Sequence, residues 1–242
     1  MFSAVSRDNR LVFCSLVFWG IGEGLWWYLL PIYIGDLGAD PVEIGFVLSV
    51  SMVAVTVSYI PLGWVSDRVS RRKVMSLGWF AGMAAIVMVA TAQTWQLVVP
   101  GLVLYFLSGA ITPVLNAYVT AANSDGSQLR RVFTLVFSGF LIGTMLSPIV
   151  GGWLADMWGL RQVFCLAAIF FAISTVLILM IREQPVRSFT PSDGADSLHG
   201  NRVFVTLCVL FFLIHLSGHL GIPLSPKFLQ EERGLTMSQI GI

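Results

Sequence analysis

The sequence has 242 residues, of which 56% are hydrophobic and 11% are charged, with a mean hydropathy of +0.83. A soluble protein carries about 25% charged residues, and a soluble core of this size could not bury so much apolar surface. The formal charge of +1 and the 3 cysteines, all inside apolar runs, give no indication of a nucleic-acid partner, a disulfide framework or a metal site. The composition predicts an all-α integral membrane protein.

Apolar runs long enough to cross a bilayer recur along the chain. A span needs about 20 apolar residues to cross a hydrocarbon core of about 30 Å. The first run, 11–34, is too long for the apolar region of a signal peptide and is predicted to be a retained first helix. The further runs that qualify are 42–62, 74–92, 95–119, 132–154, 162–181 and 203–223.

The Lys and Arg residues are concentrated in alternate loops, and this predicts the topology. With the N-terminus in the cytoplasm, the inner segments hold most of the 14 Lys and Arg residues: Arg7, Arg10, Arg68, Arg71, Arg72, Lys73, Arg130, Arg131, Arg182, Arg187 and Arg202. The outer segments hold Arg161, Lys227 and Arg233. The bias follows the positive-inside rule and predicts a multi-pass protein of the cell membrane.

Glu23 is the one acidic residue well inside a run. A charged group at that depth costs about 2.5–3.5 kcal/mol on insertion scales and is a functional candidate by default. Trp19, Trp26 and Trp27 lie one helical turn away. Because aromatic faces suit organic cations, Glu23 is predicted to carry a coupling proton or to pair with a cationic substrate, in a cavity walled by these tryptophans. Alternatively, the tryptophans form an interfacial belt and Glu23 bonds to a neighbouring helix.

Segment 63–73 concentrates charge between the second and third runs. It resembles the signature loop of the major facilitator superfamily, roughly Gly-x-Leu-Ala-Asp-Arg-x-Gly-Arg-Arg, with Ser70 in place of the turn glycine. The resemblance implies an all-helical transporter whose cytoplasmic gate is set by the matching residues: Gly63, Asp67, Arg68, Arg71 and Arg72. The alternative is a positive-inside anchor without a mechanical role.

The fourth run departs from the pattern of related exporters. These often place an Arg one turn before a Gly, and aligned on Gly109 that position is Tyr105. Asn116 is the one amide in the middle of the run. We expect Tyr105 and Asn116 to face the substrate cavity, although Asn116 suits a bond between helices equally well.

The fifth run carries a second motif, at 143–152. It resembles the Gly-x-x-x-Gly-Pro-x-x-Gly-Gly signature of proton-driven exporters, through Gly143, Ser147, Pro148, Gly151 and Gly152. Small residues at this spacing let helices touch along their backbones, and a proline bends a helix. Generic packing of a proline-kinked helix is the alternative interpretation.

A polar segment divides the chain. We predict a six-helix bundle over 1–181, a cytoplasmic linker over 182–202 and the start of a second bundle over 203–242. After the linker, the pattern of 31–45 returns at 226–241: a proline, a polar loop with Leu and Gly, and an Ile-Gly pair. Such repeated halves are typical of transporters.

His215 and His219 lie one turn apart in the seventh run. We expect them to contact substrate from the cavity wall, with packing or a bond between helices as the alternative. A metalloprotease motif would require Glu at the position of Leu216, so the pair does not indicate a metal site.

These features together predict the N-terminal half of a major facilitator transporter plus its seventh helix, with the C-terminal half expected in the intact protein. The expected function is proton-coupled export of a small organic solute by alternating access, with the lipid bilayer as surroundings and the proton gradient in place of a cofactor. The chain is not expected to be an enzyme. The alternatives are a facilitative or uptake transporter of a metabolite, and a non-transporting membrane receptor, interaction protein or defective fragment.

Overall fold

The computed structural model describes residues 6–66, 69–121, 126–183, 202–219 and 222–241, and these form helices without any strand. The elements are α1 (Arg7–Trp26), η2 (Trp27–Leu29), α2 (Leu30–Asp36), α3 (Pro41–Ser66), α4 (Arg71–Thr91), α5 (Trp95–Gly109), α6 (Thr112–Ala121), α7 (Gly126–Trp158), α8 (Leu160–Leu179), α9 (Arg202–His219), η4 (Ile222–Leu224), α10 (Ser225–Arg233) and α11 (Met237–Ile240). The prediction of an all-α architecture is confirmed.

Six continuous helical stretches within the described ranges are long and apolar enough to cross a membrane: Arg7–Asp36, Pro41–Tyr59, Arg71–Thr91, Trp95–Ala121, Leu129–Trp158 and Leu160–Leu179. They correspond to the first six predicted runs. Helix α9 occupies most of the seventh.

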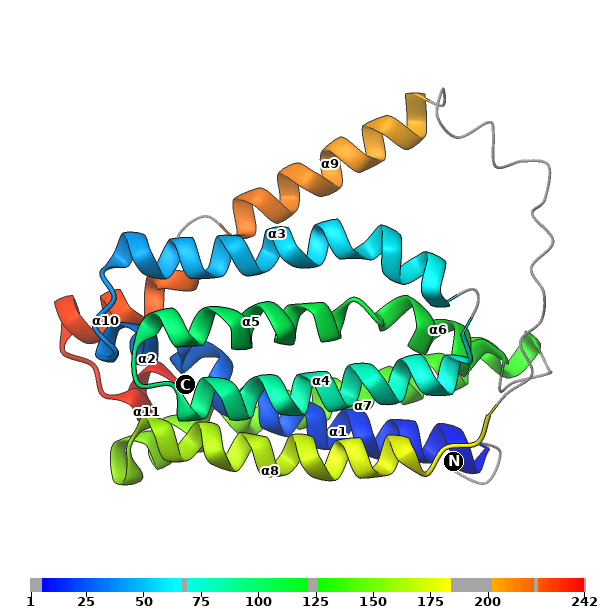
Figure 1. Cartoon of the computed structure of the whole chain (residues 1–242), viewed down its shortest axis with the longest axis horizontal. Coiled ribbons are helices and arrows are strands. Elements are labelled where there is room, and N and C mark those ends of the chain that lie inside the picture. The colour runs from blue at the N-terminus through cyan, green and yellow to red at the C-terminus, as the bar shows by residue number, and fades with distance from the viewer. Residues whose placement is uncertain (1–5, 67–68, 122–125, 184–201, 220–221, 242) are drawn as a thin grey trace.

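The helices lie side by side along the long axis of the molecule (Figure 1). Helix α1 packs against α7 and α8, α4 packs against α5 and α8, and α3 packs against α5. Helices α10 and α11 lie at one end of the bundle, which we call the α10 end. The opposite end, where α1 begins, is the N-terminal end.

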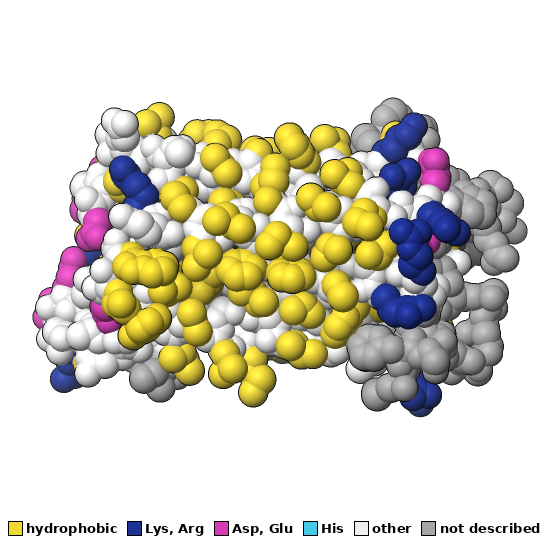
Figure 2. All heavy atoms as spheres, turned by 90° about the horizontal axis from the view of Figure 1, so that it is seen from below, with side chains coloured by type: hydrophobic (Ala, Val, Ile, Leu, Met, Phe, Trp, Pro, Cys, Tyr) yellow, Lys and Arg dark blue, Asp and Glu magenta, His cyan; other side chains and the backbone are white. Residues whose placement is uncertain are grey.

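Figure 2 shows how side-chain chemistry is divided along one face of the molecule. Hydrophobic side chains cover the middle of this face, most of its visible Lys and Arg side chains lie at the N-terminal end, and its Asp and Glu side chains lie mainly at the α10 end. Since charged side chains are costly in hydrocarbon, the apolar middle marks the part that faces lipid.

Two of the predicted spans are each built from two α-helices. Pro31 lies in the first turn of α2, and its ring crowds the carbonyl of the residue four positions earlier, Trp27, where the 3₁₀ turn begins. Pro113 stands in the same relation to Gly109, the last residue of α5. The Gly109 carbonyl accepts a hydrogen bond from the hydroxyl of Thr112 at 2.8 Å instead.

The turn before α3 and the turn before α11 repeat one design. Each consists of a 3₁₀ turn, a short helix whose second residue is a proline, a glycine at positive φ and a reciprocal cap on the next helix. Before α3 these parts are η2, Pro31, Gly38 (φ 94°) and the cap formed by Asp40 and Glu43. Before α11 they are η4, Pro226, Gly234 (φ 65°) and the cap formed by Thr236 and Gln239. These are the segments in which the sequence pattern recurs.

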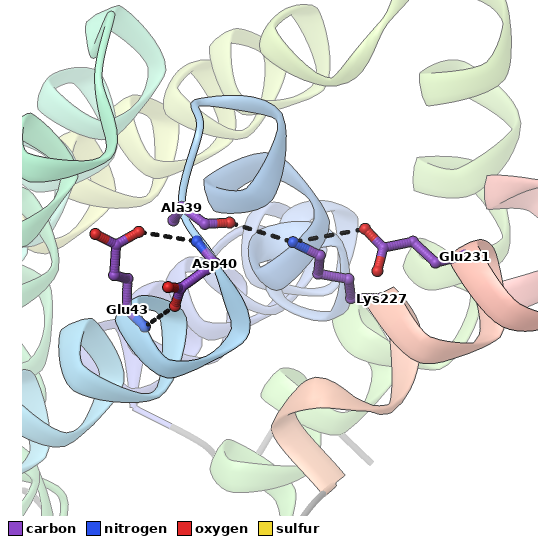
Figure 3. Close-up of polar contacts among 5 residues, drawn as sticks. All are labelled: Ala39, Asp40, Glu43, Lys227 and Glu231. Atoms are coloured by element: carbon purple, nitrogen blue, oxygen red, sulfur yellow. Dashed lines mark hydrogen bonds and ion pairs between the residues drawn. The ribbon is translucent and has the colours of Figure 1, made fainter.

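The cap on α3 is visible in Figure 3. The backbone N–H of Asp40 donates to Glu43 Oε2 at 2.9 Å, and the backbone N–H of Glu43 donates to Asp40 Oδ1 at 2.8 Å. These bonds satisfy N–H groups that have no partner within the helix, and the two carboxylates favour its positive end. The acidic residues of this loop therefore have a structural role.

Helices α1 and α7 touch along their backbones. A Cβ atom added to Gly143 would lie 2.7 Å from the backbone nitrogen of Ile21, and one added to Gly24 would lie 2.7 Å from the Cβ of Ser147. The α7 side of this contact repeats at every fourth position, through Gly139, Gly143, Ser147 and Gly151. Small residues at this spacing allow the approach that larger side chains would prevent.

The last part of the α7 motif faces other partners. A Cβ atom at Gly152 would lie 2.7 Å from the carbonyl carbon of Met237 in α11. The carbonyl of Pro148 accepts a hydrogen bond from the hydroxyl of Tyr28. The motif thus joins α7 to α1 by one set of positions and to α11 by another.

We predict that Gly143→Ala destabilises the bundle by about 1–3 kcal/mol, because the new methyl group forces α1 and α7 apart. Thermal unfolding in detergent, followed by size-exclusion chromatography, measures the change. Gly45→Ala is the matched control, since a Cβ atom at Gly45 meets nothing within 4 Å. It should leave stability unchanged or raise it by about 0.4–1 kcal/mol. Equal effects of the two substitutions would show that the α1–α7 contact tolerates a larger side chain.

Candidate functional site

Glu23 lies on the face of α1 that lines a cavity. Leu16, Trp19, Glu23 and Trp27 follow one another at intervals of about one helical turn, and all line the cavity. The glycines between them face other helices: Gly20 and Gly24 contact α7, and Gly22 contacts Phe171 and Ala167 of α8. The glycines allow α1 to pack closely against α7 and α8 on one side, and the side of α1 that carries Glu23 faces the cavity.

Two donors from different helices bind the same oxygen of Glu23. The indole Nε1–H of Trp19 donates to Oε2 at 3.1 Å, and the hydroxyl of Tyr105 on α5 donates to Oε2 at 2.6 Å. Hydrogen bonds to a charged group are stronger than neutral ones and partly replace the water that the carboxylate has lost. Tyr105 is thus a direct partner of Glu23.

Aromatic rings surround the two donors. Trp19 stacks on Phe171 with ring centroids 4.3 Å apart and meets Trp79 edge-on at 5.4 Å. Tyr105 lies 5.1 Å from Trp26 and 6.4 Å from Trp27, measured between ring centroids. These contacts fix the orientation of the side chains that hold Glu23.

The cavity has a volume of about 710 Å³, which is within the range of about 300–1,000 Å³ typical of sites for small organic ligands. Its wall is contributed by α1, η2, α3, α4, α5, α6 and α7, together with Ile111 between α5 and α6, and Glu23 is the one charged residue among the described residues that line it. The aromatic members of the lining are Trp19, Trp27, Tyr59, Trp79, Tyr105, Phe106, Phe137 and Phe140. The arrangement offers aromatic faces and a single acidic group.

Trp79 belongs to this wall but was not among the predicted site residues. Its indole Nε1–H donates to Ser174 Oγ on α8 at 2.9 Å, and Ser174 Oγ lies 2.7 Å from Ser15 Oγ on α1. Both serines are fully buried. This network joins α1, α4 and α8 and sets the orientation of the Trp79 ring. The signal in the sequence that could have indicated this network is the adjacent pair of hydroxyl residues, Ser174 and Thr175, within an apolar run.

Other predicted cavity residues lie elsewhere. Trp26 is fully buried, does not belong to the described lining, and packs on Tyr105 and Phe164. Asn116 is also absent from the described lining, and its buried Oδ1 has no hydrogen-bond partner within the described part of the chain. His215 and His219 belong to α9, but their side chains lie outside the described residues.

At the N-terminal end, arginines from the predicted gate loop bind the carbonyls of two helices. Arg71 Nη1 donates to the Ala117 carbonyl of α6 at 3.4 Å, and Arg72 Nη2 donates to the Leu179 carbonyl of α8 at 2.8 Å. Cations near helix C-terminal ends are favoured by the helix dipole. Gly63 lies in the last turns of α3, whereas Asp67 and Arg68 lie outside the described residues.

The chain is similar to curated multidrug resistance proteins over most of its length. Multidrug resistance protein MdtG of Proteus mirabilis (strain HI4320) is 33% identical over 199 residues, which cover 78% of this chain and 47% of that protein. Multidrug resistance protein MdtG of Serratia proteamaculans (strain 568) is 33% identical over 189 residues, with coverage of 74% and 44%. The matched part therefore spans less than half the length of these relatives.

Solved transporter structures share the fold. A POT family transporter in complex with 5-aminolevulinic acid superposes with a TM-score of 0.68 at 17% identity, over 90% of this chain and 48% of that chain. The human organic anion transporter MFSD10 (TETRAN) gives a TM-score of 0.63 at 18% identity, over 97% and 67%. At these identities the likeness concerns the fold alone.

A family model described as Major Facilitator Superfamily matches residues 12–242. This match covers nearly the whole chain, and the six membrane-length helices and the fold shared with solved transporters agree with it. The chain belongs to the Major Facilitator Superfamily.

Proposed function

We propose that the full-length protein exports small organic cations or neutral aromatic compounds in exchange for protons, and that Glu23 binds either the proton or the cation. The observation that carries this proposal is the presence of one carboxylate, held by Trp19 and Tyr105, among the described residues that line an aromatic cavity. The names of the MdtG relatives, which are multidrug resistance proteins, support export.

A single carboxylate provides a simple basis for exchange. In its ionised form Glu23 attracts an organic cation, whose apolar parts contact the aromatic faces of the cavity. In its protonated form it offers no charge to the cation, and it no longer carries the cost of a buried unpaired charge. A proton that arrives therefore favours release of the cation, and a cation that arrives favours release of the proton.

The distribution of charge suggests how the molecule is placed in the cell membrane. The basic N-terminal end, with Arg71 and Arg72, is proposed to face the cytoplasm according to the positive-inside rule. The two arginines, together with Asp67 and Arg68, are proposed to form the inner gate. Rocking of this half against the C-terminal half would then expose the cavity to each side in turn.

Glu23→Gln should lower proton-driven transport at least about tenfold, because the amide cannot exchange a proton and carries no charge for a cation. Uptake of ethidium into inverted vesicles that contain the full-length protein, driven by an imposed pH gradient, measures the effect. Glu183→Gln removes an exposed carboxylate and is the control with equal charge change.

Full gradient-driven activity of Glu23→Gln would exclude Glu23 as the proton carrier. Gradient-independent ethidium equilibration in both proteins would favour facilitated passage. Movement of solute only toward the cytoplasm would favour an uptake transporter, and absence of any solute movement in the wild-type protein would favour a non-transporting role.

We also predict that an aromatic cation binds better than an aromatic anion of similar size. Benzyltrimethylammonium should quench the tryptophan fluorescence of the protein in nanodiscs, and its affinity should decrease as the pH falls, because protons compete for Glu23. In Glu23→Gln the affinity should be about tenfold weaker and independent of pH. Phenylacetate is the comparison ligand. Tighter binding of phenylacetate than of the cation would contradict the proposed charge preference.

A further inference from the structure

Two charged side chains join residues 222–241 to helices α1–α8, which we call the first bundle, at the α10 end. Asp156, near the C-terminal end of α7, accepts hydrogen bonds from the backbone N–H groups of Met237 at 3.0 Å and Ser238 at 2.9 Å. Lys227 Nζ of α10 donates to the Ala39 carbonyl, in the turn before α3, at 3.3 Å. The two contacts involve separate parts of the first bundle, the C-terminal end of α7 and the turn before α3.

Lys227 fits closely into the first bundle. Its side chain is 11% exposed, and Figure 3 shows it pointing from α10 toward the Ala39 carbonyl, with Glu231 on its other side at 3.6 Å. A Cβ atom at Gly35 would lie 2.5 Å from Nζ. The absence of a side chain at Gly35 therefore makes room for the ammonium group.

The contacts are reciprocal. Asp156 of the first bundle supplies a carboxylate to the backbone N–H groups of Met237 and Ser238. In return, Lys227 of α10 supplies an ammonium group to the backbone carbonyl of Ala39. Close backbone packing surrounds them: a Cβ atom at Gly152 would lie 2.8 Å from the Cα of Ser238, and one at Gly241 would lie 2.8 Å from the hydroxyl of Tyr28. A backbone group cannot move far from its own helix or turn to follow a side chain. The hydrogen bonds of Asp156 and Lys227 therefore break once α10 and α11 move away from the first bundle.

We propose that Asp156 and Lys227 form a two-point lock that holds the α10 end closed and that must open before this end admits or releases solute. Alternating access requires the two halves of a transporter to part at one end while they meet at the other. The lock joins residues on both sides of that division. It rests on the alternating access of the proposed function, but it depends on neither Glu23 nor the nature of the solute.

Distances between spin labels test the lock directly. In the full-length protein, with native cysteines replaced by serine, labels are attached through Val42→Cys at the start of α3 and Phe228→Cys in α10, both exposed positions. Pulsed electron paramagnetic resonance in nanodiscs then gives the distribution of distances between the halves at the α10 end. No substrate or proton gradient is needed, so failure of the export proposal would not affect this result.

Asp156→Asn and Lys227→Met are expected to raise the ratio of open to closed molecules by about tenfold each, because each removes a charge-assisted hydrogen bond made only in the closed form. The control Glu232→Gln removes an exposed charge of the same helix as Lys227 and should leave the distribution unchanged. Lys227→Arg keeps a cation and should retain the short distance.

Unchanged distributions in Asp156→Asn and Lys227→Met, in protein that elutes from size exclusion as the wild type does, would overturn the proposal. Opening by Lys227→Arg as large as that by Lys227→Met would also overturn it, since the positive charge would then have no part in closure. Asp156→Glu provides a further variant with the carboxylate retained, and it should open less than Asp156→Asn.

Discussion

The close approach of α1 and α7 is the constraint on which the candidate site depends. A helix that touches another along its backbone cannot turn about its axis without moving bulky side chains into the contact. Gly20 and Gly24 therefore determine which residues of α1 face elsewhere, and those residues include Trp19 and Glu23. The position of the carboxylate in the cavity follows from packing on the other side of the same helix.

The second requirement is solvation of that carboxylate inside an apolar bundle. Trp19, from the same helix, and Tyr105, from α5, supply hydrogen bonds to one oxygen. A tyrosine can do this without bringing a second charge into the membrane. An arginine at that position would form an ion pair with Glu23 and reduce its ability to bind another cation. The tyrosine thus leaves Glu23 as the one charged residue among the described residues that line the cavity.

Hydropathy and charge were sufficient to predict the class of the fold and the position of the first six spans. These signals act over about 20 residues, and the bilayer imposes them on any helical membrane protein. The breaks at Pro31 and Pro113 are local, and both prolines were visible in the sequence. Their effect on the helices was not predicted, because a proline within a membrane span is often tolerated without a break.

The site was predicted in part, for reasons of geometry. Helical spacing correctly suggested that Trp19 and Trp27 share a face with Glu23, but Trp26 lies at the junction with the 3₁₀ turn and packs away from the cavity. Trp79 could not be assigned from its own helix, because its orientation is set by serines on α1 and α8. Contacts between residues far apart in the chain leave little trace in local patterns.

The repeated turns before α3 and α11 have a consequence for how the protein is made. Each turn carries its own proline, its own glycine at positive φ and its own reciprocal cap, so its shape is specified by residues within a single short segment. Such a segment is able to adopt its bend while the ribosome is still adding later helices. The second turn then needs no template from the first.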